Sequence, residues 1–509
     1  MFDFRLARIV VWLLVSGGLA PLAIITCLAS GLGIFDGILV SGVVLGLVWL
    51  AVSVWVPARL GSSGRGAQVL LGAATLVGLL AGLRIAATST FMLDPADTRF
   101  AVYGEKKWAI RHNCFTGYLV AAELASGGAE NIYERSQYRG SAKKTRIHAT
   151  IGDRFTIDRY PYPPAFLILP RLLLATGQGF LEIRTFWFAL SAAMLILALL
   201  ATMTWCGGFR DNRRLLFLPL LLLAPTTAVA LQIENVQLIL LSLCVLGMIA
   251  FARERPALGG ALLGFAILIK LWPGVLLVHL LLGRRWRAVL WTVGAMVAYC
   301  LAALLIFGQA PFRAFLDYEL PRLASGESFA FMQSNSRALV VNTSLFGVLH
   351  KLHALGYLLS KPPLLSPLIQ WNYTTLLVVI VLAVGLRQRV ARGPSDGGDQ
   401  LRLGEVRTWL ALLTLVQLRS PFLPWSYGVL SALWLLLLFL PSRAWPIVLP
   451  AAAWLSVSLL LPRAVEPTAL YLWYTMGGTG LMLATALLAA VLALRAPAAR
   501  AGGEAGAAR

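Results

Sequence analysis

The feature that most constrains this chain is its succession of apolar runs, many of them near the length that crosses a bilayer. A membrane-spanning helix needs about 20 consecutive apolar residues. Of the 509 residues 59% are hydrophobic and 13% are charged, whereas a soluble protein has about 25% charged residues. The sequence therefore predicts an all-α polytopic membrane protein of about 12 spans. These are expected at residues 9–31, 37–56, 69–92, 186–205, 215–231, 236–251, 288–307, 368–386, 409–418, 429–440, 446–461 and 470–494.

The charge of the chain indicates its orientation. There are 43 Lys and Arg residues against 22 Asp and Glu residues, and many of these bases gather in short loops between the apolar runs. Short basic loops face the cytoplasm. We therefore expect a multi-pass protein of the cytoplasmic (inner) membrane, with both termini inside, surrounded by membrane lipids and without a nucleic-acid partner.

Two longer polar segments divide the chain. Residues 94–162 and 308–367 are predicted to face the outside, because the short basic loops near them face the other way. The predicted division is 1–93, N-terminal spans; 94–162, long external loop; 163–307, transmembrane core; 308–367, second external loop; 368–494, C-terminal spans; and 495–509, disordered cytoplasmic tail.

One apolar stretch, residues 258–282, has basic residues at both ends and therefore cannot be a single span. Arg255 precedes it and Arg284 follows it, while Lys270 and Pro273 lie near its midpoint. Proline breaks a helix, so the stretch is predicted to be a re-entrant hairpin of two short helices. A lysine at that depth is a functional hypothesis, and its ammonium group could hold a lipid phosphate.

Three acidic residues are candidates for a general base at the outer membrane boundary. Asp158 precedes the proline-rich stretch 161–164, where the chain re-enters the membrane, and Asp94 and Asp97 follow the third predicted span. A base must lie within hydrogen-bond distance of the proton that it takes, and prolines restrict the backbone. We therefore place Asp158 first.

Polar side chains in apolar surroundings are the candidates for substrate binding. Glu234 and Asn235 interrupt two apolar runs, where polar groups are costly unless they face a cavity. Asn342 and Ser344 offer amide and hydroxyl groups that suit a sugar. The predicted substrate-binding residues are Lys270, Glu234, Asn235, Asn342, Ser344, Arg159, Arg337, Tyr118 and Trp425, with His350 and His353 as alternative bases.

Motifs for nucleotides and metals are missing from the sequence. There is no Walker-type phosphate loop, no Asp-x-Asp pair, and no His and Cys arrangement at zinc-site spacing. Four of the five cysteines lie in or beside apolar runs, so no disulfide is expected. The chain is predicted to use neither a metal nor a soluble nucleotide cofactor.

Several stretches together resemble glycosyltransferase family 87, within the GT-C superfamily. Their order and spacing carry the resemblance more than any one of them does. They are residues 115–133 with Tyr118, 162–170 beginning Tyr-Pro-Pro, 232–238, 260–273 ending Lys-Leu-Trp-Pro, 284–287, 342–345 and 420–427.

The resemblance implies transfer of a hexosyl residue, with mannosyl as the first expectation, from a polyprenyl-phosphate sugar to a lipid or glycan acceptor on the outer face of the membrane. It also implies a catalytic carboxylate in the first external loop. The family usually has an acid four residues before the position of Tyr118, and this chain has Cys114 there. The expected base therefore moves to Asp158. Lys270 and loop arginines would stabilise the departing phosphate.

Two other readings remain open at this point. A secondary transporter or lipid flippase could use Glu234, Lys270 and the broken hairpin as a midplane site. A catalytically inactive GT-C-like subunit would account for Cys114. The large external loops favour the enzyme over the transporter.

Overall fold

The computed structural model describes residues 65–102, 107–138, 145–151, 154–208, 211–333, 335–390, 398–457 and 469–495, and these form α-helices and one two-stranded sheet. Within them, five helices are long and apolar enough to cross a membrane, or six when one bent pair counts as a span. The all-α class is confirmed, whereas about 12 spans are not, because several other apolar helices have only 10–17 residues. The spans predicted at 9–31 and 37–56, and the tail beyond residue 495, lie outside the described residues.

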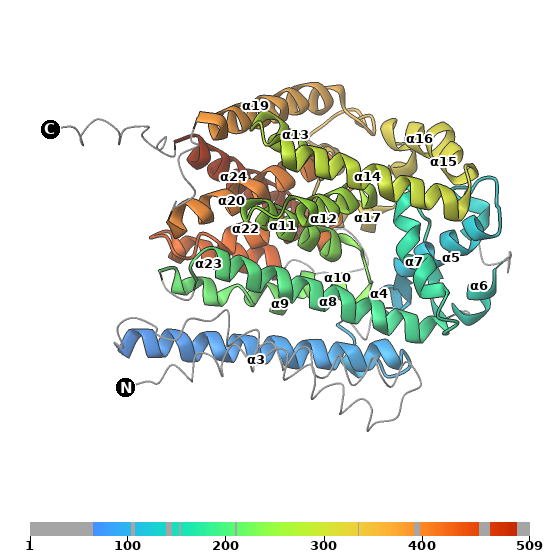
Figure 1. Ribbon diagram of the computed structural model, residues 1–509, viewed down its shortest axis with the longest axis horizontal. Helices are drawn as coiled ribbons and strands as arrows, with labels where there is room; N and C mark the ends of the chain where they lie inside the picture. The colour runs from blue at the N-terminus through green and yellow to red at the C-terminus, as the bar shows by residue number, and fades with distance from the viewer. Residues whose placement is uncertain are drawn as a thin grey trace.

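The apolar helices lie side by side along the long direction of the molecule, with α3 next to α8 and with α11, α12, α20 and α24 in the middle (Figure 1). Their bounds are α3 Arg65–Leu93, α8 Phe180–Trp205, α9 Leu220–Leu223, α10 Pro225–Gln232, α11 Gln237–Ala252, α12 Pro256–Ile269, α13 Gly274–Leu282, α14 Trp286–Phe307, α19 Thr374–Val390, α20 Asp399–Leu418, α21 Trp425–Gly428, α22 Leu430–Leu437, α23 Trp445–Val457 and α24 Ala469–Arg495.

Two predicted spans differ from the observed helices. The span expected at 215–231 is bent by 51° between α9 and α10, because Ala224 is extended and Pro225, which has no N–H group, begins α10. The span expected to begin at residue 409 begins instead at Asp399 in α20. Its early turns bury Leu403 and Val406 completely, so packing extends the helix into the polar segment.

The stretch predicted as a hairpin consists of two helices, α12 and α13, separated at Lys270. Helices α12 and α14 run in the same direction, since Gly260 of α12 faces Trp291 and Gly264 faces Met296. A Cβ at Gly260 would lie 2.5 Å from the backbone of Trp291, so the two backbones approach as small residues permit. Because α12 and α14 are parallel, α13 must bring the chain back toward the end where α12 began.

The basic loops of the sequence meet at one end of the helices. Arg253 and Arg402 both lie over the ring of Trp205, which ends α8, with 5.5 and 4.7 Å to the ring centroid. Arg285 pairs with Glu405 at 3.7 Å. Three loops assigned to the cytoplasmic side by charge are thus neighbours in space.

Short elements gather at the opposite end, where α5, α6, α7, α15 and α16 lie at the right of Figure 1. The label η denotes a 3₁₀ or π-helical turn. The short elements of the described residues are η1 Thr98–Phe100, α4 Lys107–Arg111, β1 His112–Asn113, α5 Phe115–Ser126, η2 Arg135–Tyr138, α6 Arg146–Ile151, β2 Thr156–Ile157, η4 Pro164–Leu167, α7 Ile168–Leu174, η5 Arg213–Phe217, α15 Ala310–Ala314, η6 Phe315–Glu319, α16 Leu320–Ala324, η7 Glu327–Gln333, α17 Ser336–Val341, α18 Leu345–Ala354 and η8 Ile369–Tyr373. Of these, η5 belongs to the basic end, where Arg214 contacts the carbonyl of Ser442.

This arrangement makes the topology testable. Cysteines placed at Ser136 and Ser325, both exposed, are expected to react with an impermeant maleimide in intact cells. A cysteine at Ala444, exposed in the loop that Arg214 of the basic end contacts, should react only after permeabilisation. The parent chain measures background from the native cysteines. Protection of Ser136→Cys and Ser325→Cys in intact cells would contradict an outward-facing site.

Candidate active site

Asp158 is held by two segments that are far apart in the sequence. Strands β1 and β2 pair in parallel, with His112 opposite Thr156, and this brings the first turn of α5 beside the residues after β2. The backbone N–H of Asp158 donates to Oγ1 of Thr116 at 3.0 Å. A Cβ at Gly117 would lie 2.6 Å from the carbonyl oxygen of Asp158, so only glycine permits this approach. The backbone at Asp158 is therefore closely restrained.

The carboxylate of Asp158 lies in a cluster with His112 and Cys114. Oδ1 of Asp158 is 3.4 Å from Nδ1 of His112, and Nε2 of His112 is 3.7 Å from Sγ of Cys114. Burial acts to lower the pKa of His112, but the neighbouring Asp158 and Cys114 outweigh it and hold that pKa well above its usual 6.5. Burial raises the pKa of the Cys114 thiol. The cluster thus favours the imidazolium form of His112.

The turn between α10 and α11 forms hydrogen bonds with this cluster. The N–H of Cys114 donates to the carbonyl of Ile233 at 2.8 Å, and Nδ2 of Asn235 donates to Sγ of Cys114 at 3.4 Å. Glu234 is fully buried with φ +56° and accepts from Nδ2 of Asn113 at 2.7 Å. Asn235 therefore contacts the cluster directly. Glu234 instead accepts a hydrogen bond from Asn113, the residue between His112 and Cys114.

A second charged cluster joins the two segments that are predicted to be external. Arg159 forms an ion pair with the buried carboxylate of Glu319, which also lies 3.5 Å from Arg322 and accepts from Ser328 at 3.0 Å. Burial raises the pKa of Glu319 despite these partners. Two guanidinium groups are thereby held together on the side of the cavity near Asp158.

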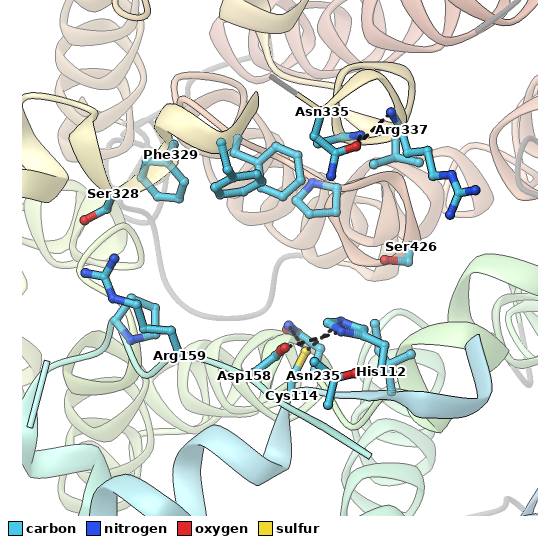
Figure 2. A pocket seen from close by; sticks show the side chains of 18 of the residues that line it. His112, Cys114, Asp158, Arg159, Asn235, Ser328, Phe329, Asn335, Arg337 and Ser426 are labelled. Carbon is cyan, nitrogen blue, oxygen red and sulfur yellow. Dashed lines mark hydrogen bonds and ion pairs between the residues drawn. The ribbon is translucent and has the colours of Figure 1, made fainter. Parts of the chain in front are cut away.

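A cavity of about 1330 Å³ contains both clusters. Figure 2 shows His112, Cys114, Asp158 and Asn235 on one wall, and Ser328, Phe329, Asn335 and Arg337 across the space from them. Its polar and aromatic lining comprises Lys107, Trp108, His112, Cys114, Tyr118, Arg135, Thr156, Asp158, Arg159, Tyr162, Asn235, Glu319, Arg322, Glu327, Ser328, Phe329, Phe331, Asn335, Ser336, Arg337, Phe422, Ser426, Tyr427 and Tyr471. Of the predicted site residues, the structure brings together Asp158, Arg159, Tyr118, Asn235 and Arg337 here.

Lys270 lies next to this cavity. Its Nζ is 5.4 and 5.1 Å from the ring centroids of Tyr162 and Tyr427, two side chains that line the cavity. Nζ also donates to Oε1 of Gln237 at 2.9 Å, and Gln237 donates to Gln417 at 3.0 Å. The ammonium group is thus satisfied by aromatic rings and a buried amide chain.

The other two candidate bases lie elsewhere. Asp94 accepts from the backbone N–H of Ala96 just beyond α3, and Asp97 forms an exposed pair with Arg99 at 2.7 Å. The exposed partner Arg99 lowers the pKa of Asp97 through its hydrogen bond. Neither carboxylate lines the cavity.

Three predicted substrate-binding residues are buried outside the cavity and form hydrogen bonds to backbone groups. Asn342 accepts from the N–H groups of Ser344 and Leu423, at 3.0 and 2.9 Å. Ser344 caps α18 and donates to the carbonyl of Pro421 at 3.0 Å. Trp425 donates to the carbonyl of Leu455 at 2.9 Å. The alternative bases His350 and His353 lie in α18 and do not line the cavity.

Asn342→Ala is expected to destabilise the protein rather than act on chemistry. It would leave two buried N–H groups without their acceptor, at a cost of about 1–3 kcal/mol each. The thermal midpoint of the purified protein should fall, whereas Asn372→Ala at an exposed position should leave it unchanged. A loss of more than tenfold in transfer per folded molecule, with an unchanged midpoint, would instead assign Asn342 to the substrate.

Several cavity residues escaped sequence reasoning. His112 and Asp158 are brought together by the pairing of β1 with β2. No periodicity in the sequence predicts that these two strands pair. Glu319 and Arg322 lie in a segment read as a plain external loop. The one available sign was Cys114, whose place four residues before Tyr118 marked this turn as unusual.

Comparison with protein-family models matches residues 160–421 to glycosyltransferase family 87, which is just over half of the chain. The chain belongs to glycosyltransferase family 87. Comparisons with curated proteins and with solved structures find no match. Membership of the family confirms the resemblance, and the apolar helices make this family 87 glycosyltransferase a multi-pass membrane protein.

The matched stretch of the family 87 enzyme includes Asn235, Lys270, Glu319 and Arg337. It begins two residues after Asp158, so the cluster with His112 and Cys114 precedes it. The base must therefore be argued from the geometry of this chain.

Proposed function

We propose that this glycosyltransferase moves a hexosyl residue, with mannosyl as the first candidate, from a polyprenyl-phosphate sugar to a lipid or glycan acceptor on the outer face of the cytoplasmic membrane. The observation that carries the proposal is one cavity that combines a restrained carboxylate with several cationic side chains. The cavity is lined by residues of the two segments predicted to be external, and these segments lie away from the end where the basic loops meet (Figure 1).

The charge of the cavity suits a phosphate-linked donor. Its lining includes the basic residues Lys107, Arg135, Arg159, Arg322 and Arg337. Guanidinium groups bind phosphate through paired hydrogen bonds. Arg159 lies directly after Asp158 in the chain, so a base and a phosphate-binding group are presented together.

The position of Asp158 supports its role as base. Its carboxylate lies within 4.8 Å of the sulfur of Cys114. Cys114 stands at the sequence position where the family resemblance expects an acid, so the carboxylate of Asp158 lies close to the expected place of that acid. Asp158 would take the proton of the acceptor hydroxyl, whose oxygen attacks the anomeric carbon. The bond from that carbon to the phosphate oxygen breaks, and polyprenyl phosphate leaves with the bonding electrons, stabilised by Arg159 and its neighbours.

The donor class can be tested directly. Purified enzyme in lipid nanodiscs would be supplied with short-chain polyprenyl-phosphate mannose, glucose or galactose carrying a radiolabel, together with a membrane-lipid extract. Label should move from one of these donors into a new product, whereas labelled nucleotide sugars should give none. Transfer from a nucleotide sugar in the absence of any polyprenyl phosphate would contradict the proposed donor.

A further inference from the structure

His112, Cys114 and Asp158 offer three different ligand atoms to a metal ion. One nitrogen, one sulfur and one oxygen from these residues lie within 4.8 Å of one another. In a tetrahedral zinc site, bond lengths of about 2.0–2.3 Å place ligand atoms about 3.3–3.7 Å apart. In the structure Oδ1 of Asp158 lies 3.4 Å from Nδ1 of His112, and Sγ of Cys114 lies 3.7 Å from Nε2. A single ion would bind only one of these two nitrogens, so the side chains must rotate to bring that nitrogen, the sulfur and the carboxylate oxygen from within 4.8 Å to tetrahedral separations.

The surroundings are those of an open metal site. All three residues line the cavity, so a fourth coordination position would face its space (Figure 2). Asn235 donates to the sulfur of Cys114, and outer hydrogen bonds of this kind orient metal ligands. The Cys114 thiol forms no disulfide with the other described cysteines, which are Cys206 at the end of α8, Cys244 in α11 and Cys300 in α14.

The donor set selects a class of ion. Thiolate and imidazole favour Zn²⁺ and similar transition metals, whereas Mg²⁺ and Ca²⁺ prefer sites made only of oxygen. Coordination would release the thiol proton of Cys114 and any proton on the coordinating nitrogen of His112. A carboxylate oxygen of Asp158 that is bonded to the metal no longer has that lone pair for a proton.

We propose that His112, Cys114 and Asp158 bind one zinc-class divalent cation and that this binding inhibits sugar transfer. The binding follows from the three ligands alone, and the inhibition rests on the proposed role of Asp158 as base. The site would make the enzyme sensitive to transition metals on the outer side of the membrane.

Binding is tested on the full chain in nanodiscs with Zn²⁺ and with Co²⁺. The parent should retain one Zn²⁺ per chain after buffer exchange, and Co²⁺ should give a thiolate charge-transfer band. Cys114→Ser should abolish the band and weaken Zn²⁺ affinity at least tenfold. His112→Asn should weaken Zn²⁺ affinity by a similar factor. Cys300→Ser is the matched control and should behave like the parent. Absence of stoichiometric metal in the parent, or equal binding by Cys114→Ser, overturns the site.

Inhibition is tested by the ratio of transfer with and without Zn²⁺ within each variant. The ratio should fall at least tenfold for the parent and for Cys300→Ser at saturating Zn²⁺, and far less for Cys114→Ser. Metal binding without inhibition overturns the inhibitory role while leaving the donor proposal to its own test. Failure of every polyprenyl-phosphate sugar as donor would overturn the proposed function and leave the binding result standing.

Discussion

Asp158→Asn is expected to lower the rate of sugar transfer by about 10²–10⁴, the usual contribution of a general base. The substitution keeps the size of the side chain and removes its basicity. The hydrogen bond from the Asp158 N–H to Thr116 and the contact with Gly117 involve only the backbone of Asp158, so both should persist. The measurement is single-turnover transfer from the identified donor, at equal amounts of folded protein.

Asp97→Asn and Asp94→Asn are the matched controls for this loss. Both residues lie in the same predicted external segment as Asp158, and neither lines the cavity. Both variants should transfer sugar at close to the parental rate. If Asp158→Asn keeps the parental rate while one of these two does not, the base is that other residue. If all three keep full activity, transfer does not use a carboxylate from this group.

Arg159→Gln is expected to reduce kcat/KM for the donor by about 10²–10³, in the range found for removal of a group that stabilises a developing anion. Arg159 lines the cavity and is held by Glu319, so its guanidinium is positioned before the donor binds. The leaving phosphate gains charge as the glycosidic bond breaks, and the loss should therefore be seen mainly in the chemical step. Single-turnover rates at saturating donor measure the chemical step, and rates at donor concentrations well below KM measure kcat/KM.

Arg99→Gln is the control for Arg159→Gln, because it breaks an exposed ion pair with Asp97 in the same segment. It should leave kcat/KM unchanged. Since Glu319 keeps Arg322 as a neighbour, Arg159→Gln should still fold, which a thermal melt would check. A variant with normal stability and parental kcat/KM would show that Arg159 serves only to link the two predicted external segments through its ion pair with Glu319.

The sequence predicted the long helices well and the short ones poorly. Helices α3, α14 and α24 begin and end within a few residues of the apolar runs that predicted them, because a continuous apolar run leaves few other ways to satisfy the backbone in lipid. The bend at Pro225 was missed although proline is visible in the sequence. A proline within an apolar run can begin a straight helix or can bend one. Which of the two occurs depends on how the neighbouring helices pack against it.

Part of the cavity lining was predictable from the local sequence, and part depends on contacts between distant segments. Asp158 was chosen because prolines follow it, and the structure places it in the cavity. His112 could not be paired with it, because their contact depends on strands separated by a long loop. Asn342 and Ser344 looked like sugar ligands because amides and hydroxyls serve both sugars and backbone groups. Burial, which the sequence does not report, places these two against the backbone of 421–423.

The absence of a side chain at Gly117 has a mechanical consequence. The carbonyl of Asp158 rests on α5, and α5 is itself anchored by Phe115, whose ring stacks on Trp187 of the long helix α8 with centroids 4.7 Å apart. The carboxylate is therefore carried by the membrane domain, although it belongs to a loop. A tilt of α8 that follows a change in bilayer thickness would move the reactive oxygen with it. If Asp158 is the base, the lipid composition of the bilayer would therefore be expected to affect the rate of transfer.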